Sequence, residues 1–110
     1  MIYLANAFSL SMLARHTVTL RCDPITPEQA RSLLRDAQEW VSCVGHEDTA
    51  RIYSKILAVD VPARRVSVSL APWDTLLVGQ YSGPRLPEGV TTLPPGARVD
   101  WWVIVVEGGP

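Results

Sequence analysis

The sequence has no large excess of charge of either sign. Ten Lys and Arg residues stand against eleven Asp and Glu residues, which gives a formal net charge of −1. Proteins that bind long nucleic acids through phosphate contacts usually carry a basic excess. Its absence argues against extended DNA or RNA as a partner. A compact anion held by a few arginines stays compatible with this charge.

Cysteine and histidine are scarce, with two residues of each. Cys22 and Cys43 form no Cys-x-x-Cys pair, so we expect reduced core cysteines and neither a disulfide nor a metal site. No HxH, HD or HExxH cluster is present, and two histidines supply too few ligands for a metal-dependent phosphodiesterase. We therefore expect no metal and no other cofactor.

Long apolar runs are also missing. No segment approaches the ~18 apolar residues that span a bilayer, and no secretory signal pattern opens the chain. These absences predict a cytoplasmic protein without membrane contact. Hydrophobic residues make up 47% of the sequence and charged residues 19%, which favours a folded chain over a disordered one. The length allows one hydrophobic core, so residues 1–110 are expected to form a single domain.

The hydrophobic pattern predicts strands interleaved with helices. Continuous or alternating apolar residues predict strands over 1–5, 17–22, 65–70, 74–81 and 99–107. Helices are expected over 7–14 with Asn6 as N-cap, from Pro27 to about Trp40, and from about His46 to Leu57. Thr26, Pro27 and Gln29 form a capping-box pattern. A turn is expected over 23–27, and Pro and Gly predict an irregular loop over 82–98. This order indicates an α/β (α+β) fold, a mixed β-sheet flanked by helices.

Three short segments carry more specific information than the periodicity. They are Tyr3-Leu4-Ala5-Asn6-Ala7-Phe8-Ser9 with Met12-Leu13, then Val44-Gly45-His46-Glu47-Asp48-Thr49, and then Gln80 with Arg85-Leu86-Pro87-Glu88-Gly89. Together and in this order they closely resemble segments of the viral type III anti-CRISPR ring nuclease family and its bacterial CRISPR-associated relatives. The resemblance covers nearly the whole chain, from Ile2 to the strand that ends at Glu107.

The resemblance implies a homodimer that binds cyclic tetra-adenylate in a pocket across its two-fold axis. This cyclic oligoadenylate is a second messenger that switches on nucleases in type III CRISPR antiviral defence. The family cleaves the ring without metal into linear di-adenylate with 2′,3′-cyclic phosphate ends, which ends the signal. A viral member would act in the host cytoplasm. A ring of identical nucleotides has a two-fold axis of its own, which suits a symmetric dimer.

The resemblance also assigns the residues of a candidate catalytic centre. His46 matches the family's catalytic histidine, and Arg65 stands where the family has an arginine that opens the same strand. Arg85 and Glu88 match the arginine and glutamate of its Arg-Leu-x-Glu-Gly segment. The polar residues that match its ligand pocket are Asn6, Ser9 and Gln80. Gly45 is added because a glycine lets the backbone approach a phosphate closely.

The residue types fit the chemistry of ring cleavage. RNA supplies its own nucleophile, the ribose 2′-hydroxyl, so the protein has to hold in-line geometry, protonate the leaving 5′-oxygen and stabilise charge at phosphorus. His46 suits the acid role because both forms of an imidazole exist near neutral pH. Arg65 and Arg85 offer planar guanidinium groups that match phosphate oxygens. Glu88 would orient Arg85 or the 2′-hydroxyl.

Simpler explanations exist for each residue. A lone histidine, a strand-end arginine and a loop glutamate are often only solvated, and Asn6 can act as a helix cap alone. Trp101 and Trp102 must point to opposite faces of their strand, so one is expected in the core and the other at a subunit contact or stacked on adenine. Two alternatives stand for the whole protein. One is a sponge that binds a cyclic nucleotide without cutting it, and the other is an inhibitor that acts through protein contact.

Overall fold

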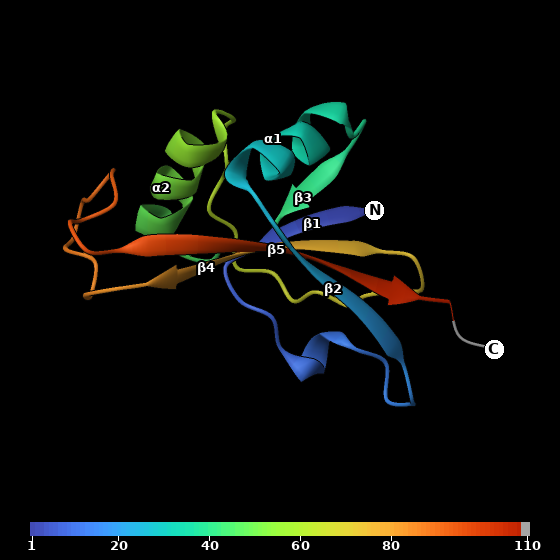
Figure 1. The fold of residues 1–110 in the computed structure, drawn as a ribbon. Helices are drawn as coiled ribbons and strands as arrows, with labels where there is room; N and C mark the ends of the chain where they lie inside the picture. Colours follow the sequence, from blue (N-terminus) through green and yellow to red (C-terminus); the bar gives the residue numbers. More distant parts are fainter. Residues whose placement is uncertain (109–110) are drawn as a thin grey trace.

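Five strands form one mixed sheet in the computed structural model, which describes residues 1–108 (Figure 1). The strand order is β2-β5-β4-β1-β3. β1 is parallel to both β3 and β4, whereas β5 is antiparallel to β4 and β2. The strands are β1 (Ile2–Ala5), β2 (Thr19–Ile25), β3 (Trp40–Ser42), β4 (Thr75–Ser82) and β5 (Arg98–Glu107). The predicted mixed sheet with helices is confirmed.

Both long helices begin where the sequence predicts. Helix α1 (Pro27–Asp36) opens at the capping box, in which the Thr26 hydroxyl accepts from the Gln29 amide at 3.1 Å and the Gln29 side chain accepts from the Thr26 amide at 2.9 Å. It ends before the predicted Trp40, because that residue starts β3. Helix α2 (Glu47–Leu57) has His46 as its N-cap.

The alternation of side chains along the strands produces two cores, one on each face of the sheet. On the face covered by α1 and α2, the helix-side core holds Leu4, Leu77 and Trp101 against the buried Tyr53 of α2. The opposite core holds Leu76 and other strand residues beneath irregular chain (Figure 1). The ends of β1, β4 and β5 lie within one residue of the predicted ranges 1–5, 74–81 and 99–107.

Residues 7–14 do not form the predicted helix. Only a 3-10 turn, Leu10–Met12, is present, and Ser9 caps it in place of Asn6. Phe8, Met12 and Leu13 nevertheless pack against the opposite core. A short helix is marginal on its own. Here the half-buried apolar side chains lie on irregular chain that crosses the sheet, so the helix prediction was wrong.

Residues 65–70 pair with no strand of the sheet in the described part of the chain. Val68 and Leu70 are buried in the opposite core, so the alternation in the sequence reports burial and not ladder pairing. At its end the Leu70 amide donates to the Met12 carbonyl at 2.8 Å, which ties the segment to the irregular chain beside it. The predicted strand is thus an extended covering segment.

The strand β2 is longer than expected. It begins at Thr19 and runs to Ile25, through most of the predicted turn over 23–27. Pro24 is tolerated there because β2 is an edge strand: its outer side has no neighbouring strand that would need a backbone N–H from this residue.

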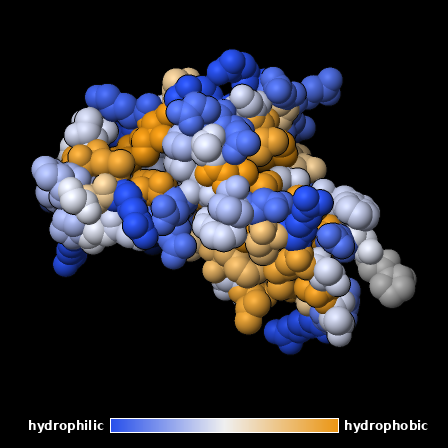
Figure 2. All heavy atoms as spheres, in the orientation of Figure 1, coloured by the Kyte–Doolittle hydropathy of each residue, from blue (hydrophilic) through white to orange (hydrophobic). Residues whose placement is uncertain are grey.

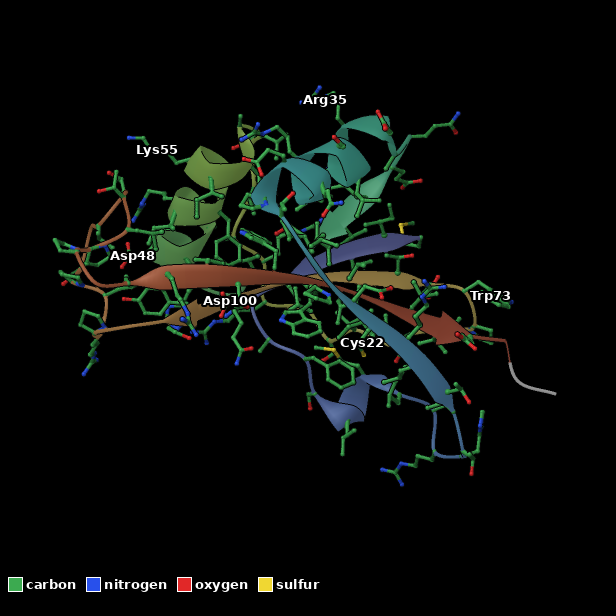
Figure 3. The ribbon with its side chains drawn as sticks, viewed as in Figure 1. Cys22, Arg35, Asp48, Lys55, Trp73 and Asp100 are labelled. Atoms are coloured by element: carbon green, nitrogen blue, oxygen red, sulfur yellow. The ribbon has the colours of Figure 1, made fainter. Side chains whose placement is uncertain are left out.

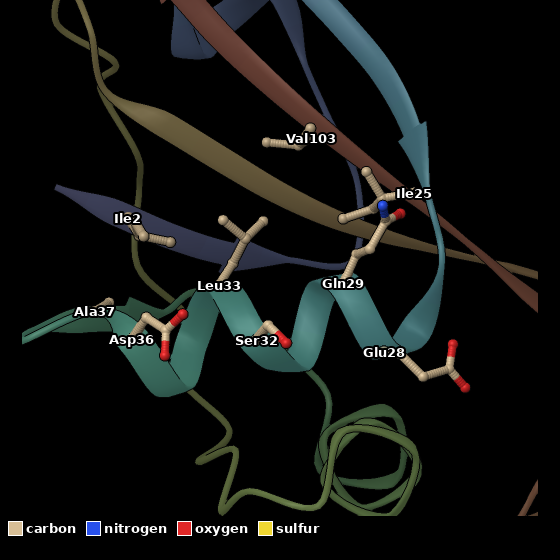
Figure 4. A pocket seen from close by; sticks show the side chains of 9 residues that line it. All are labelled: Ile2, Ile25, Glu28, Gln29, Ser32, Leu33, Asp36, Ala37 and Val103. Carbon is tan, nitrogen blue, oxygen red and sulfur yellow. The ribbon is translucent and has the colours of Figure 1, made fainter.

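Helix α1 leaves part of its sheet face uncovered, and the space-filling view shows hydrophobic residues at the surface among hydrophilic ones (Figure 2). A groove of about 730 Å³ lies beside it, with Leu33 of α1 pointing across toward Ile2 and Val103 of the sheet (Figure 4). None of the site residues predicted from the sequence lines this groove. Within residues 1–108, no helix is long and apolar enough to cross a membrane.

Candidate functional site

The candidate residues gather where the parallel strands end. Asn6 follows β1, Gly45 and His46 follow β3, and Gln80 lies near the carboxyl end of β4. Because β1 is parallel to β3 and β4, these three ends lie at one edge of the sheet. Ligands of α/β sheets bind outside the carboxyl ends of such strands. The topology thus brings three distant segments of the sequence to a common edge.

His46 lies between two adjoining hollows, which we call together the His46 site. One, of about 750 Å³, is lined by the first turn of α2, by Tyr81 of β4 and by residues 85–88. The other, of about 480 Å³, is lined by Gly45, Arg65 and the same helix end. Glu88 lines both hollows. Five of the eight predicted site residues therefore meet here: Gly45, His46, Arg65, Arg85 and Glu88.

The N-terminus of α2 gives this site its polarity. The His46 side chain makes no capping hydrogen bond and is exposed, while its carbonyl accepts the first helical bond from the Ala50 amide at 2.9 Å. First-turn N–H groups have no partner inside a helix, and they carry the positive end of its dipole. An anion at this position would meet both.

Arg65 reaches the site through backbone contacts and not through strand pairing. The Arg64 amide donates to the Val44 carbonyl at 2.7 Å, and Arg65 Nε donates to the Gly45 carbonyl at 3.3 Å. A Cβ atom on Gly45 would lie 3.3 Å from the Arg65 Cγ, so the missing side chain leaves room for the arginine stem. These contacts fix Arg65 beside the first turn of α2.

The loop over residues 83–97 carries Arg85 and Glu88. Leu86 and Val90 pack against the helix-side core, which holds the loop next to α2. The Tyr81 hydroxyl donates to the Pro84 carbonyl, directly before Arg85. The loop is thus anchored on both sides of Arg85, and its charged side chains are exposed at the site.

Charges of both signs line the site. The carboxylates of Glu47, Asp48 and Glu88 stand against the guanidinium groups of Arg51, Arg65 and Arg85. Arg51 is occupied by Asp48, with an N–O distance of 2.8 Å. Within residues 1–108, neither Arg65 nor Arg85 forms an ion pair. Directional bonds from these two arginines and the helix end are therefore the available means of holding a phosphate.

The remaining predicted residues lie apart from His46. Asn6 and Gln80 line a separate hollow of about 380 Å³, with Phe8, Cys22 and Trp102. We call it the amide–aromatic hollow. Because neighbouring residues of a strand point to opposite faces, Gln80 faces the opposite core and Tyr81 faces α2.

Figure 3 shows the two regions on either side of the sheet, with Asp48 labelled in the His46 site and Cys22 in the amide–aromatic hollow. Ser9 is not among the residues that line either region. Its hydroxyl accepts from the Ser11 amide at 3.3 Å in the 3-10 turn. The structure therefore divides the predicted ligand-binding residues between two faces.

Sequence reasoning missed several lining residues. Tyr81 of the His46 site follows Gln80 directly, and the alternation of a strand would have placed it on the other face. Cys22 was expected in the core but is exposed in the amide–aromatic hollow. Among the described residues, no group of three or more His, Cys, Asp or Glu side chains is arranged to hold a metal ion.

Comparison with known proteins matches most of the chain. A family model described as STIV B116-like matches residues 2–94. The protein named uncharacterized protein 26 of Sulfolobus islandicus filamentous virus (isolate Iceland/Hveragerdi) is 31% identical over 77 residues, which are 70% of this chain and 64% of that protein. The chain thus matches slightly less than two thirds of that relative's length. B116 of Sulfolobus turreted icosahedral virus shares the fold, with a TM-score of 0.82 and 22% identity over 94% of this chain and 97% of that one.

Proposed function

The chain belongs to the STIV B116-like family, and from this premise and the geometry of the His46 site we propose that it is a metal-independent ring nuclease. Its substrate is cyclic tetra-adenylate, and its products are linear di-adenylates with 2′,3′-cyclic phosphate ends. Cleavage would switch off type III CRISPR signalling. The resemblance of three sequence segments to the anti-CRISPR ring nucleases supplies the substrate.

One observation carries the proposal. Three segments far apart in the sequence, around His46, Arg65 and residues 85–88, converge on one exposed site at the N-terminus of α2. The site combines a histidine, two arginines without ion pairs among residues 1–108 and first-turn N–H groups of α2 that have no acceptor within the helix. Each of these groups has a use in the cleavage of a phosphodiester without metal.

The chemistry follows from these groups. The ribose 2′-hydroxyl attacks phosphorus and loses its proton to solvent water, and the bond from phosphorus to the 5′-oxygen breaks. His46 in its protonated form donates a proton to the departing 5′-oxygen, a contribution of roughly 10²–10⁴-fold. Arg65 and Arg85 bind the phosphate oxygens as charge develops, and α2 adds its N–H groups. Glu88 accepts a hydrogen bond from the 2′-hydroxyl or orients Arg85.

A homodimer is part of the proposal. A symmetric dimer presents the same residues twice, so two His46 side chains would cut opposite phosphates of a two-fold symmetric ring. Two equal di-adenylates are then the expected products. A monomer with one site would instead release a linear tetra-adenylate first, which makes the product series a test of the assembly.

The proposed activity is tested by incubating the protein with cyclic tetra-adenylate in EDTA and resolving the products by mass. We expect di-adenylate with a 2′,3′-cyclic phosphate, formed at the same rate with and without the chelator. An intact ring that remains bound to the protein would support a sponge. An intact ring without binding would overturn the nucleotide function and leave the protein-contact inhibitor. Activity that is lost in EDTA would contradict the metal-independent mechanism.

A further inference from the structure

We infer that the amide–aromatic hollow is a base-binding subsite in which Trp102 stacks on a purine while the side-chain amides of Asn6 and Gln80 bind its edge. The inference rests on the proposed function and assigns a specificity role to Trp102. The observations that carry it are the exposure of the Trp102 indole, the uncharged lining of the hollow and the place of Asn6 and Gln80 at the carboxyl edge of the parallel strands, on the face of the sheet opposite to the His46 site.

Trp102 is the exposed member of the tryptophan pair on β5. Trp101 is 3% exposed in the helix-side core, whereas Trp102 is 36% exposed on the other face of the sheet. Its neighbours in the hollow include the half-buried Phe8, so a flat ligand that enters would meet two aromatic side chains. Aromatic side chains accept bases by stacking in many proteins that bind single-stranded nucleic acids.

The polar groups of the hollow suit a base and not a phosphate. The described residues that line it carry no formal charge, and their longest polar side chains are the primary amides of Asn6 and Gln80. A primary amide donates and accepts at once, so it pairs with the neighbouring N6 amino group and N7 atom of adenine. Uracil and cytosine also carry a neighbouring donor and acceptor, but their single ring offers a smaller face to the Trp102 indole, so we expect adenine to bind more tightly.

The two regions therefore suit different parts of a nucleotide. The His46 site offers guanidinium and backbone N–H groups for phosphates, and the amide–aromatic hollow offers ring faces and amides for a base. Gln80 and Tyr81 are consecutive on β4, yet each lines a different region. A ring bound at the carboxyl edge of the parallel strands would lie between the two, with phosphates toward one and a base toward the other.

The first test measures base binding without cleavage, using the dinucleotide ApA and the fluorescence of the four tryptophans. We expect ApA to quench the wild-type emission and UpU to quench it far less at equal concentration. Trp102→Leu should weaken ApA binding by about 5- to 150-fold, the range typical of one lost stacking contact. Trp102→Phe keeps a stacking ring and should restore most of the affinity, measured by competition. Trp73→Phe is the matched control, because Trp73 is 66% exposed and lies outside the hollow.

The second test uses Cys22, an exposed thiol in the same hollow. ApA should slow the alkylation of Cys22 by a maleimide, while Cys43, which lies outside the hollow and is half-buried, should react at an unchanged rate. Protection that depends on protein concentration and not on ApA would mean that a second copy of the chain covers Trp102, and it would overturn the inference.

The failure of this inference differs from the failure of the proposed function. Quenching and Cys22 protection by ApA without any ring cleavage would support the base subsite and reject the nuclease. The wild type could instead cleave the ring with a KM that Trp102→Leu leaves unchanged, while ApA fails to protect Cys22. That result would support the nuclease function and overturn the base-binding subsite. Equal affinity for ApA and UpU would refute the proposed preference of the hollow for a purine.

Discussion

Replacement of Gly79 by alanine tests the packing that fastens α2 to the sheet. A Cβ atom at this position would lie 2.6 Å from Cζ3 and 2.8 Å from Cη2 of Trp101, and 2.8 Å from Cζ of Tyr53. Both rings are buried, with centroids 4.9 Å apart, and the Tyr53 hydroxyl donates to the Gly79 carbonyl. Neither ring can retreat without displacing the rest of the helix-side core. Overpacking of a core costs about 1–3 kcal/mol, and contact with two rigid rings points to the upper end, about 3 kcal/mol.

Thermal and urea unfolding measure this effect. At about 4 °C per kcal/mol for a domain of this size, Gly79→Ala should lower Tm by about 12 °C. The control is a double-mutant cycle with Trp101→Leu, which removes two of the three close contacts. The loss of stability in the double variant should then be smaller than the sum of the two single losses. A Tm within about 2 °C of the wild type, or strictly additive losses, would refute the contact between Gly79 and these rings.

Three further predictions concern other contacts. Arg31 of α1 donates hydrogen bonds of 3.1 and 2.8 Å to the Leu57 and Ile56 carbonyls at the end of α2. Arg31→Met removes both and should lower the free energy of unfolding, measured in urea, by about 2 kcal/mol. Arg35 is exposed, so the control Arg35→Met should change it by less than about 0.5 kcal/mol. Burial raises the pKa of Tyr53 above its usual range, so above about pH 10 only the unfolded chain ionises at this residue and the folded state loses stability. Between about pH 10 and 11.5 the free energy of unfolding should therefore fall more steeply for the wild type than for Tyr53→Phe, by up to about 1.4 kcal/mol per pH unit. Tyr81→Phe removes the hydrogen bond to the Pro84 carbonyl, which lies next to Arg85. Because a small displacement of a catalytic group lowers the rate strongly, ring cleavage should slow by about tenfold, while the melting temperature should stay within about 2 °C of the wild type.

Local signals explain which elements were predictable. The capping box at Thr26 and the start of α2 at His46 depend on neighbours within one helical turn, so the sequence is sufficient to identify them. The segment with Phe8, Met12 and Leu13 has helical spacing, but its conformation is set by the sheet face that it covers. Residues 65–70 alternate for the same reason, because burial on one side produces the same pattern as a strand.

The candidate site was predictable in its members more than in its arrangement. The resemblance brought together His46, Arg85 and Glu88, which line one hollow. It did not indicate that Asn6 and Gln80 lie on the other face of the sheet, because that depends on strand order and on the direction of one side chain. The alternation along β4 would have separated Gln80 from the His46 site once the strand was located.

The most direct test of the central claim compares the two histidines of the chain. Cleavage of cyclic tetra-adenylate is measured in EDTA for His46→Ala and for His16→Ala, whose histidine is exposed and contacts the Thr17 carbonyl at 2.9 Å, outside the His46 site. We expect His46→Ala to lower the rate by about 10²–10⁴-fold with little change in ring affinity, and His16→Ala to cleave as the wild type does. Cleavage at the wild-type rate by His46→Ala would contradict the account.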